Sequence, residues 1–163
     1  MALGSCNHGS KVFLSLGSNS GDSLSTLCRA ATDIEKSIGK IKAKSSIYES
    51  EPWGFKAEQN FLNEVLEIET SLTPEELLHR IHAIEAAHGR IRTDSREYSS
   101  RTLDVDIIFY GDLVLESPTL VIPHPLMHQR LFVLRPLAEI APDLIHPILK
   151  RSIKELLETY VCV

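Results

Sequence analysis

The chain has 163 residues, of which 43% are hydrophobic, and it carries a formal charge of −5. This length fits one domain with a conventional core, and the acidic balance argues against nucleic-acid binding through an extended basic surface. No apolar run is long enough to cross a bilayer, and residues 1–10 lack the charged start and the apolar middle of a signal peptide. Three widely spaced cysteines support neither a disulfide framework nor a zinc site. We expect one cytoplasmic domain over residues 11–163, after a flexible lead at 1–10.

The first predicted unit is a strand, a turn and a helix. Residues 11–17, KVFLSLG, have the composition of a short buried strand, and the turn that follows leads to a helix capped by Asp22 or Ser23. Gly39 stands where a left-handed residue would end this helix. Apolar residues at helical spacing predict one buried stripe. They are Leu24, Leu27, Cys28, Ala31, Ile34 and Ile38.

The middle of the chain predicts two strands and a second helix. Residues 41–48 and 61–70 have strand composition, and these two strands could pair as neighbours. Thr73 and Glu76 supply the cap and the capping-box glutamate of the helix, and Gly89 ends it. A proline in the first turn strengthens this start. The buried stripe of the helix comprises Leu77, Leu78, Ile81 and Ile84.

A strand predicted over residues 103–110 carries two carboxylates, Asp104 and Asp106. Because side chains alternate along a strand, both point to one face, with roughly 7 Å between their backbone positions. Like charges side by side on a strand repel one another without a cation, so a magnesium site is favoured over a solvated strand face. The proline-rich remainder predicts loops, a short strand and short helices. The opposite strand face then carries Leu103, Val105, Ile107 and Phe109.

The element order β-α-β-β-α-β predicts an α+β fold of the ferredoxin-like, split βαβ type. In this fold both helices cover one face of an antiparallel sheet, and the other face is open for a ligand. Side chains opposite the buried ones must line the open face. By this count Phe61 and Asn63 share the open face with Asp104 and Asp106.

Four arginines precede the acidic strand, in a loop without apolar periodicity. Guanidinium groups bind phosphates in a bidentate geometry, so we interpret the loop as a phosphate clamp that closes over a substrate. The alternative is an ordinary exposed basic loop. The four residues are Arg90, Arg92, Arg96 and Arg101.

Three further positions have chemistry that fits such a site. His124 lies between two prolines, where donation to a phosphate and a structural role are equally supported. Arg130 and Phe132 could place a cation and an aromatic ring on the same side of an extended segment. Trp53, in a loop with proline and glycine, could stack on a flat heterocycle or pack onto the core. The residues alone thus indicate metal-assisted phosphate chemistry.

Seven short segments between Lys11 and Pro147 form a pattern in consistent order. They are LGSN (16–19), YESEPWGF (48–55), FLN (61–63), IEAAHGRIR (84–92), RTLDVDIIFYG (101–111), IPHP (122–125) and RLFVLRPLAEIAPD (130–143). This pattern resembles the 6-hydroxymethyl-7,8-dihydropterin pyrophosphokinase family of folate biosynthesis. Its most specific part is RTLDxDI followed at this distance by PHP.

The resemblance implies a reaction and a set of ligands. Members of the family transfer pyrophosphate from ATP to the hydroxymethyl group of the pterin, with AMP and the pterin diphosphate as products. Two Mg²⁺ ions are expected as cofactors, and ATP is the co-substrate. The product would pass to dihydropteroate synthase.

The resemblance also implies roles for individual residues, matched position by position. Arg92 and Arg101 match the arginines that assist catalysis, and Asp104 and Asp106 match the metal ligands. Contacts to ATP are implied for Glu85, Arg90, Arg92, Ile107, His124 and Arg130. Contacts to the pterin are implied for Ser50, Trp53, Phe61, Asn63 and Phe132.

Two other functions fit part of the pattern. A nucleotidyltransferase is also described by a Gly-Ser turn followed by DxD on a strand, and it would release pyrophosphate from ATP. A non-catalytic ferredoxin-like sensor would bind a small molecule without any dependence on magnesium. The combination of arginines and aspartates argues against a passive sensor.

Overall fold

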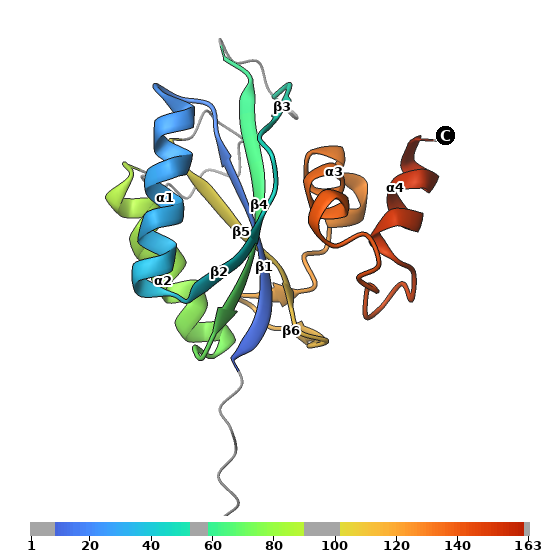
Figure 1. Ribbon diagram of the computed structural model, residues 1–163. Coiled ribbons are helices and arrows are strands. Elements are labelled where there is room, and N and C mark those ends of the chain that lie inside the picture. Colours follow the sequence, from blue (N-terminus) through green and yellow to red (C-terminus); the bar gives the residue numbers. More distant parts are fainter. Residues whose placement is uncertain (1–8, 53–58, 90–101, 162–163) are drawn as a thin grey trace, which may run out of the picture.

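The fold is built on an antiparallel sheet, shown in Figure 1 as a computed structural model that describes residues 9–52, 59–89 and 102–161. Four strands lie in the order β2-β4-β1-β5, and a short fifth strand, β3, pairs with β4. Without β3 this is the order 4-1-3-2 of a ferredoxin-like sheet, so the predicted α+β class is confirmed. The strands are β1 (Ser10–Ser18), β2 (Lys40–Lys44), β3 (Tyr48–Ser50), β4 (Phe61–Thr70) and β5 (Asp104–Tyr110).

Helices lie on both sides of the sheet. In Figure 1, α1 (Ser23–Ser37) and α2 (Pro74–Ala87) cover one face, α3 (Leu131–Ile140) packs on the other, and α4 (Ile153–Val161) lies beyond α3. None of the helices in these described ranges is long and apolar enough to cross a membrane.

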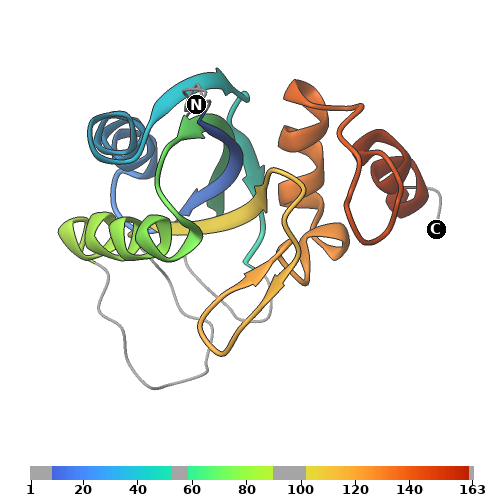
Figure 2. The same cartoon turned by 90° about the horizontal axis from the view of Figure 1, so that it is seen from below.

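Figure 2 shows a small hairpin between β5 and α3. The hairpin consists of β6 (Leu115–Glu116) and β7 (Val121–Ile122), and the short 3-10 helix η1 (Met127–Gln129) follows it.

Both predicted helix starts and both predicted helix ends are confirmed, but the left-handed conformation expected of Gly39 is wrong. Asp22 caps α1 by accepting a hydrogen bond from the Ser25 N–H at 3.1 Å, and Thr73 and Glu76 form the capping box of α2. Gly89 has a φ of +87° after α2, as a left-handed stop requires. Gly39 is not left-handed. A glycine is needed at this position because the Cβ of any other residue would lie 2.1 Å from the Glu69 carbonyl oxygen on β4.

The first core lies between the sheet and the helices α1 and α2. Most of the predicted stripe of α1 is buried there, but Leu24 is 53% exposed and Cys28 is exposed. The helix therefore presents a narrower apolar face than its composition suggested. The buried residues come from β1, β4, β5 and both helices and include Leu14, Leu16, Leu27, Ile34, Leu66, Ile68, Leu77 and Ile81.

The strand predicted over residues 41–48 is two strands in the structure. β2 ends at Lys44 and β3 begins at Tyr48, and both pair with β4. Between them the Ser45 hydroxyl accepts a hydrogen bond from the Val65 N–H at 2.9 Å. This side chain replaces a backbone acceptor of the ladder, so the segment can bend there without leaving a buried β4 amide unpaired.

β5 contains an irregularity that changes the side of one predicted residue. Phe13 pairs with Phe109 and Leu14 pairs with Ile107, so Ile108 is an extra residue on β5. As a result Phe109 does not share a face with Val105 and Ile107, as strict alternation predicted. It packs against Phe13 with a 6.3 Å distance between ring centroids, on the opposite side of the sheet.

The face of the sheet opposite α1 and α2, here called the site face, is open only in part. A second core forms where α3 packs against part of this face and α4 packs against the outer side of α3. This whole face was expected to be open, and the cover by α3 was not predicted because α3 is short and contains Pro136. The second core includes Phe13, Val65, Phe109, Val133, Leu134, Leu137 and Leu156.

Glu64 on β4 is a buried acid that the sequence analysis did not single out. Its side chain is 0% exposed on the α1–α2 side, 3.6 Å from the Lys44 ammonium. Neither carboxylate oxygen has a hydrogen-bond partner among the described residues. Burial raises the pKa of Glu64, and the nearby Lys44 partly opposes this shift.

We expect Glu64→Gln to be more stable than the wild type at pH 8. The folded protein holds the Glu64 proton more tightly than the unfolded chain, so stability falls as pH rises from the unfolded pKa, about 4.3, through the raised folded pKa. Glutamine carries no charge to desolvate. Thermal unfolding between pH 4 and pH 8 checks this, with Glu158→Gln on α4 as control. A constant stability difference across this range would contradict it.

Candidate active site

Backbone pairing places four residues of four strands in one row across the site face. Tyr48 pairs with Asn63, Asn63 with Gly17, and Gly17 with Asp104. Side chains of directly opposed residues lie on the same face of a sheet, so Asn63 and Asp104 face the same space, about 10 Å apart across two strand spacings. Two predicted site residues from distant parts of the chain therefore meet here.

Gly17 forms the floor of this row. A Cβ at Gly17 would lie 3.3 Å from the Asn63 Oδ1 and 3.7 Å from a ring carbon of Phe61. Any side chain would therefore fill the space between Asn63 and Asp104. Sequence reasoning missed this residue, although a glycine inside a strand often marks a close approach by a ligand or another backbone.

Asn63 is 3% exposed and is held by β3. Its Nδ2 donates to the Tyr48 carbonyl oxygen at 3.0 Å and to the Ser50 hydroxyl at 2.8 Å. With both N–H groups used, the Oδ1 is directed over Gly17 as an acceptor. The structure thus brings together Ser50, Asn63 and Phe61, which pairs with Ser50. Their contacts with a pterin stay a prediction.

Asp104 and Asp106 share the site face, as predicted, and an arginine and a histidine approach Asp106. Arg130 Nη1 lies 3.8 Å from Asp106 Oδ2, and His124 Nε2 lies 3.9 Å from the same oxygen. The Arg130 side chain is only 11% exposed. Asp106 therefore meets both predicted phosphate contacts, which lie about twenty residues later in the sequence.

The position of His124 depends on the irregularity in β5. Its backbone N–H donates to the carbonyl oxygen of Ile108, the extra residue, at 3.1 Å. Its Nδ1 accepts a hydrogen bond from the Leu126 N–H at 3.2 Å, so in the neutral ring the proton is on Nε2 and faces Asp106. Burial, with a smaller contribution from Arg130, lowers the pKa of His124 to about 4. At neutral pH this side chain is an uncharged donor.

Phe132 and Arg130 are paired at the start of α3. The Arg130 guanidinium carbon lies 5.6 Å from the centre of the Phe132 ring, in the range of a cation–π contact. Phe132 also packs against the second core. The predicted aromatic and cation are thus on one side, but at the beginning of a helix and not in an extended segment.

Two residues predicted to contact ATP have buried side chains on the other side of the sheet. Glu85 is 1% exposed, and its Oε2 accepts a hydrogen bond from the Val105 N–H at 3.2 Å, between the two aspartates. Ile107 is 5% exposed and belongs to the first core. Glu85 therefore supports the backbone of the acidic strand, and a contact of Ile107 with ATP would have to use its backbone. Both ATP contacts remain predictions.

Several predicted site residues lie outside the residues that the structure describes. They are Trp53 of the predicted pterin site and Arg90, Arg92, Arg96 and Arg101 of the predicted phosphate clamp. Their roles remain predictions. Within the described ranges, no three His, Cys, Asp or Glu side chains form a cluster that could hold a metal ion.

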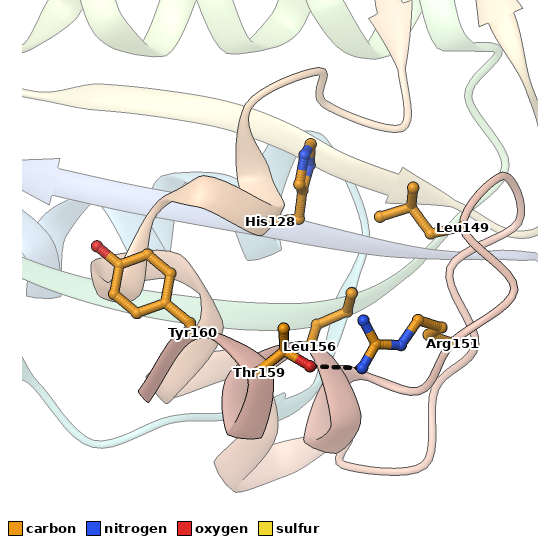
Figure 3. Close-up of a pocket in the computed structure, with 6 residues that line it drawn as sticks. All are labelled: His128, Leu149, Arg151, Leu156, Thr159 and Tyr160. Atoms are coloured by element: carbon orange, nitrogen blue, oxygen red, sulfur yellow. Dashed lines mark hydrogen bonds between the residues drawn. The ribbon is translucent and has the colours of Figure 1, made fainter. Parts of the chain in front are cut away.

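A separate pocket of about 600 Å³ lies between α4, η1 and the segment before α4 (Figure 3). In it Arg151 donates a hydrogen bond to the Thr159 hydroxyl. None of the predicted site residues lines this pocket. Its lining consists of His128, Leu149, Arg151, Leu156, Thr159 and Tyr160.

An α+β domain that groups carboxylates, a neutral histidine and an arginine on one sheet face is suited to an enzyme that handles phosphates. A family model described as 7,8-dihydro-6-hydroxymethylpterin-pyrophosphokinase (HPPK) matches residues 13–142. The chain belongs to this family, as the sequence pattern predicted. The assignment to the pyrophosphokinases of folate biosynthesis is therefore confirmed.

Relatives and solved structures agree with this assignment. The 2-amino-4-hydroxy-6-hydroxymethyldihydropteridine pyrophosphokinase of Aquifex aeolicus is 42% identical over 144 residues, 88% of each protein. Folic acid synthesis protein fol1 of Pneumocystis carinii is 39% identical over 92% of this chain, which spans 20% of that protein. The HPPK-DHPS of Plasmodium falciparum shares the fold with a TM-score of 0.77 at 18% identity, over 94% of this chain and 41% of that one.

Proposed function

We propose that this chain transfers pyrophosphate from ATP to the hydroxymethyl group of 6-hydroxymethyl-7,8-dihydropterin. The row Asn63–Gly17–Asp104 is the observation that carries this proposal. A flat bicyclic heterocycle fits the space above Gly17, with the Asn63 Oδ1 as an acceptor for its polar edge. Its hydroxymethyl group would then extend toward Asp104 and Asp106. Phe61, Phe132 and Trp53 are the proposed aromatic contacts.

The two aspartates fit a magnesium site. Both lie on the site face, both are partly exposed, and their carboxylate oxygens are ligands that Mg²⁺ prefers. Because Mg²⁺ is usually held by one or two carboxylates together with substrate phosphates and water, no larger protein cluster is needed. Bound there, Mg²⁺ would neutralise phosphate charge and activate the pterin hydroxyl. Two ions are proposed, following the family pattern.

His124 and Arg130 would bind the phosphates of ATP. Arg130 supplies a fixed positive charge next to Asp106, and the neutral His124 supplies a donor at Nε2. In such a transfer the protein mainly positions the reactants in line and stabilises charge. The pterin oxygen would attack the β-phosphorus, and the bond to the AMP oxygen would break. Arg92 and Arg101 are the proposed catalytic arginines, and Arg90 is a proposed ATP contact.

Incubation of the protein with ATP, Mg²⁺ and 6-hydroxymethyl-7,8-dihydropterin tests the proposed function. We expect AMP and the pterin diphosphate in equal amounts, and no turnover when Mg²⁺ is removed by a chelator. Release of ADP, or the absence of turnover, would refute the proposal. Release of free pyrophosphate would instead indicate the nucleotidyltransferase alternative.

A place in a pathway belongs to the same proposal. We expect the product to be consumed by a dihydropteroate synthase, because relatives such as the HPPK-DHPS of Plasmodium falciparum carry both names in one chain. A cytoplasmic location is also proposed. The lead predicted over residues 1–10 lies mostly outside the described residues, and Ser10 belongs to β1. Fractionation of cells that express the full chain would test the location.

A further inference from the structure

Glu139, near the end of α3, accepts four hydrogen bonds from a segment more than ninety residues earlier in the chain. The Ser46 N–H lies 3.1 Å from each of its carboxylate oxygens. The Ser46 hydroxyl donates to Oε1 at 2.7 Å, and the Tyr48 hydroxyl donates to Oε2 at 2.6 Å. Charge-assisted bonds of this length are stronger than bonds between neutral groups. No sequence pattern predicted this contact, because the residues that form it are distant in the chain.

The hydrogen bonds shift the pKa values of Glu139 and Tyr48 in opposite directions. The hydrogen bond from Tyr48, followed by that from Ser46, lowers the pKa of Glu139. The same bond raises the pKa of the Tyr48 phenol, because losing its proton would place a negative charge beside a carboxylate. Glu139 is exposed, so water competes for these hydrogen bonds. The role of Glu139 therefore follows from the two segments that its carboxylate joins.

On one side of the contact, Tyr48 also holds Asn63, the proposed acceptor for the polar edge of the pterin. Tyr48 begins β3, a three-residue strand whose one partner among the described strands is β4. Its backbone carbonyl accepts from the Asn63 Nδ2, and Ser50 accepts from the same nitrogen. A shift of β3 would therefore release the Asn63 amide, whose orientation fixes the acceptor over Gly17.

On the other side of the contact, Glu139 belongs to α3, which begins beside the proposed phosphate contact Arg130 and carries the proposed aromatic contact Phe132. α3 begins directly after Arg130, and Phe132 is in its first turn. Among the described residues, the hydrogen bonds between α3 and segment 46–50 all end on the Glu139 carboxylate. This one side chain thus joins the strand that holds Asn63 to the helix that carries Phe132.

We propose that Glu139 is a positioning residue that fixes the spacing between the two walls of the pterin site. The proposal rests on the proposed function, since it takes the space between Asn63 and Phe132 as the pterin site. Glu139 does not touch the substrate. It acts by holding β3 against α3, so its loss weakens pterin binding while ATP binding, which uses residues at the other end of the helix and on β5, is retained.

Steady-state kinetics of Glu139→Gln test this. Glutamine has one acceptor oxygen where glutamate has two, and its NH2 group cannot accept a hydrogen bond. The side chain therefore cannot accept from both the Ser46 hydroxyl and the Tyr48 hydroxyl as the carboxylate does. We expect the KM for the pterin to rise about tenfold, with the KM for ATP within twofold of the wild-type value. Tyr48→Phe should give a similar rise, and the double variant should show less than the product of the two effects, because both remove one interaction.

Glu158→Gln on α4 is the matched control, because it removes an exposed carboxylate outside this contact. An unchanged pterin KM in Glu139→Gln, or equal increases in both KM values, would overturn the proposal while the function stands. If Glu139→Gln does not fold, as judged by circular dichroism, Tyr48→Phe decides the matter by the same criterion. A wild-type protein that forms no AMP would refute the proposed function itself.

Discussion

Replacing Asp104 or Asp106 by asparagine is expected to lower kcat by about a thousandfold or more. Asparagine keeps the shape of the side chain but removes the charge that would hold Mg²⁺. Each aspartate lies on the site face of β5, and Asp106 is also 3.8 Å from Arg130, so the Asp106 variant loses this ion pair as well. A thousandfold loss corresponds to about 4 kcal/mol of transition-state stabilisation.

The rate of AMP formation at several Mg²⁺ concentrations measures this effect. Both variants should keep a melting temperature close to that of the wild type, because the aspartates are partly exposed and repel one another. Asp112→Asn, in the exposed turn after β5, is the matched control and should retain full activity. Near-normal turnover in both site variants would reject the magnesium role.

Gly17→Val is expected to lower kcat/KM for the pterin by about a hundredfold, mainly through KM. The Cβ alone would lie 3.3 Å from the Asn63 Oδ1, and the two methyl groups of valine would occupy the space above the strand. The backbone of β1 has no positive φ at this position, and valine is a good strand residue. The expected loss therefore comes from blocked space and not from backbone strain.

Binding of the pterin, followed by fluorescence, and binding of ATP should be measured separately for this variant. We expect pterin binding to be lost and ATP binding to be retained. Lys11→Val is the matched control, since it lies on the same face of the same strand, six residues and about 20 Å away. Pterin binding equal to that of the wild type in Gly17→Val would show that the heterocycle does not lie over Gly17.

The helix starts and the strand β4 could be predicted from the sequence, because the residues that determine them are close together in the chain. The capping box at Thr73 and Glu76, the cap at Asp22 and the bounds of β4 follow from neighbouring residues. Alternation along a strand likewise placed Asp104 and Asp106 on one face and Asn63 on the same side. The family pattern then assigned chemistry to these positions.

The errors occurred where packing between distant segments overrides a local rule. Gly39 was expected to be left-handed from its place after a helix, but its small size is needed beside the Glu69 carbonyl. Phe109 was placed by strict alternation, but the extra residue Ile108 moves it to the second core. The same irregularity makes the Ile108 carbonyl available to His124, which sequence spacing could not show.

By itself, the sequence determined the element types, the ferredoxin-like order, the pair of aspartates and the family. These follow from periodicity, capping and motif spacing, which involve residues close together in the chain. Only the tertiary structure decided that Asn63, Gly17 and Asp104 form one row, and that Glu139 joins α3 to β3. The register between strands and the docking of a helix are set by contacts between segments that are distant in the sequence, up to 93 residues apart for Ser46 and Glu139. No local pattern encodes those contacts.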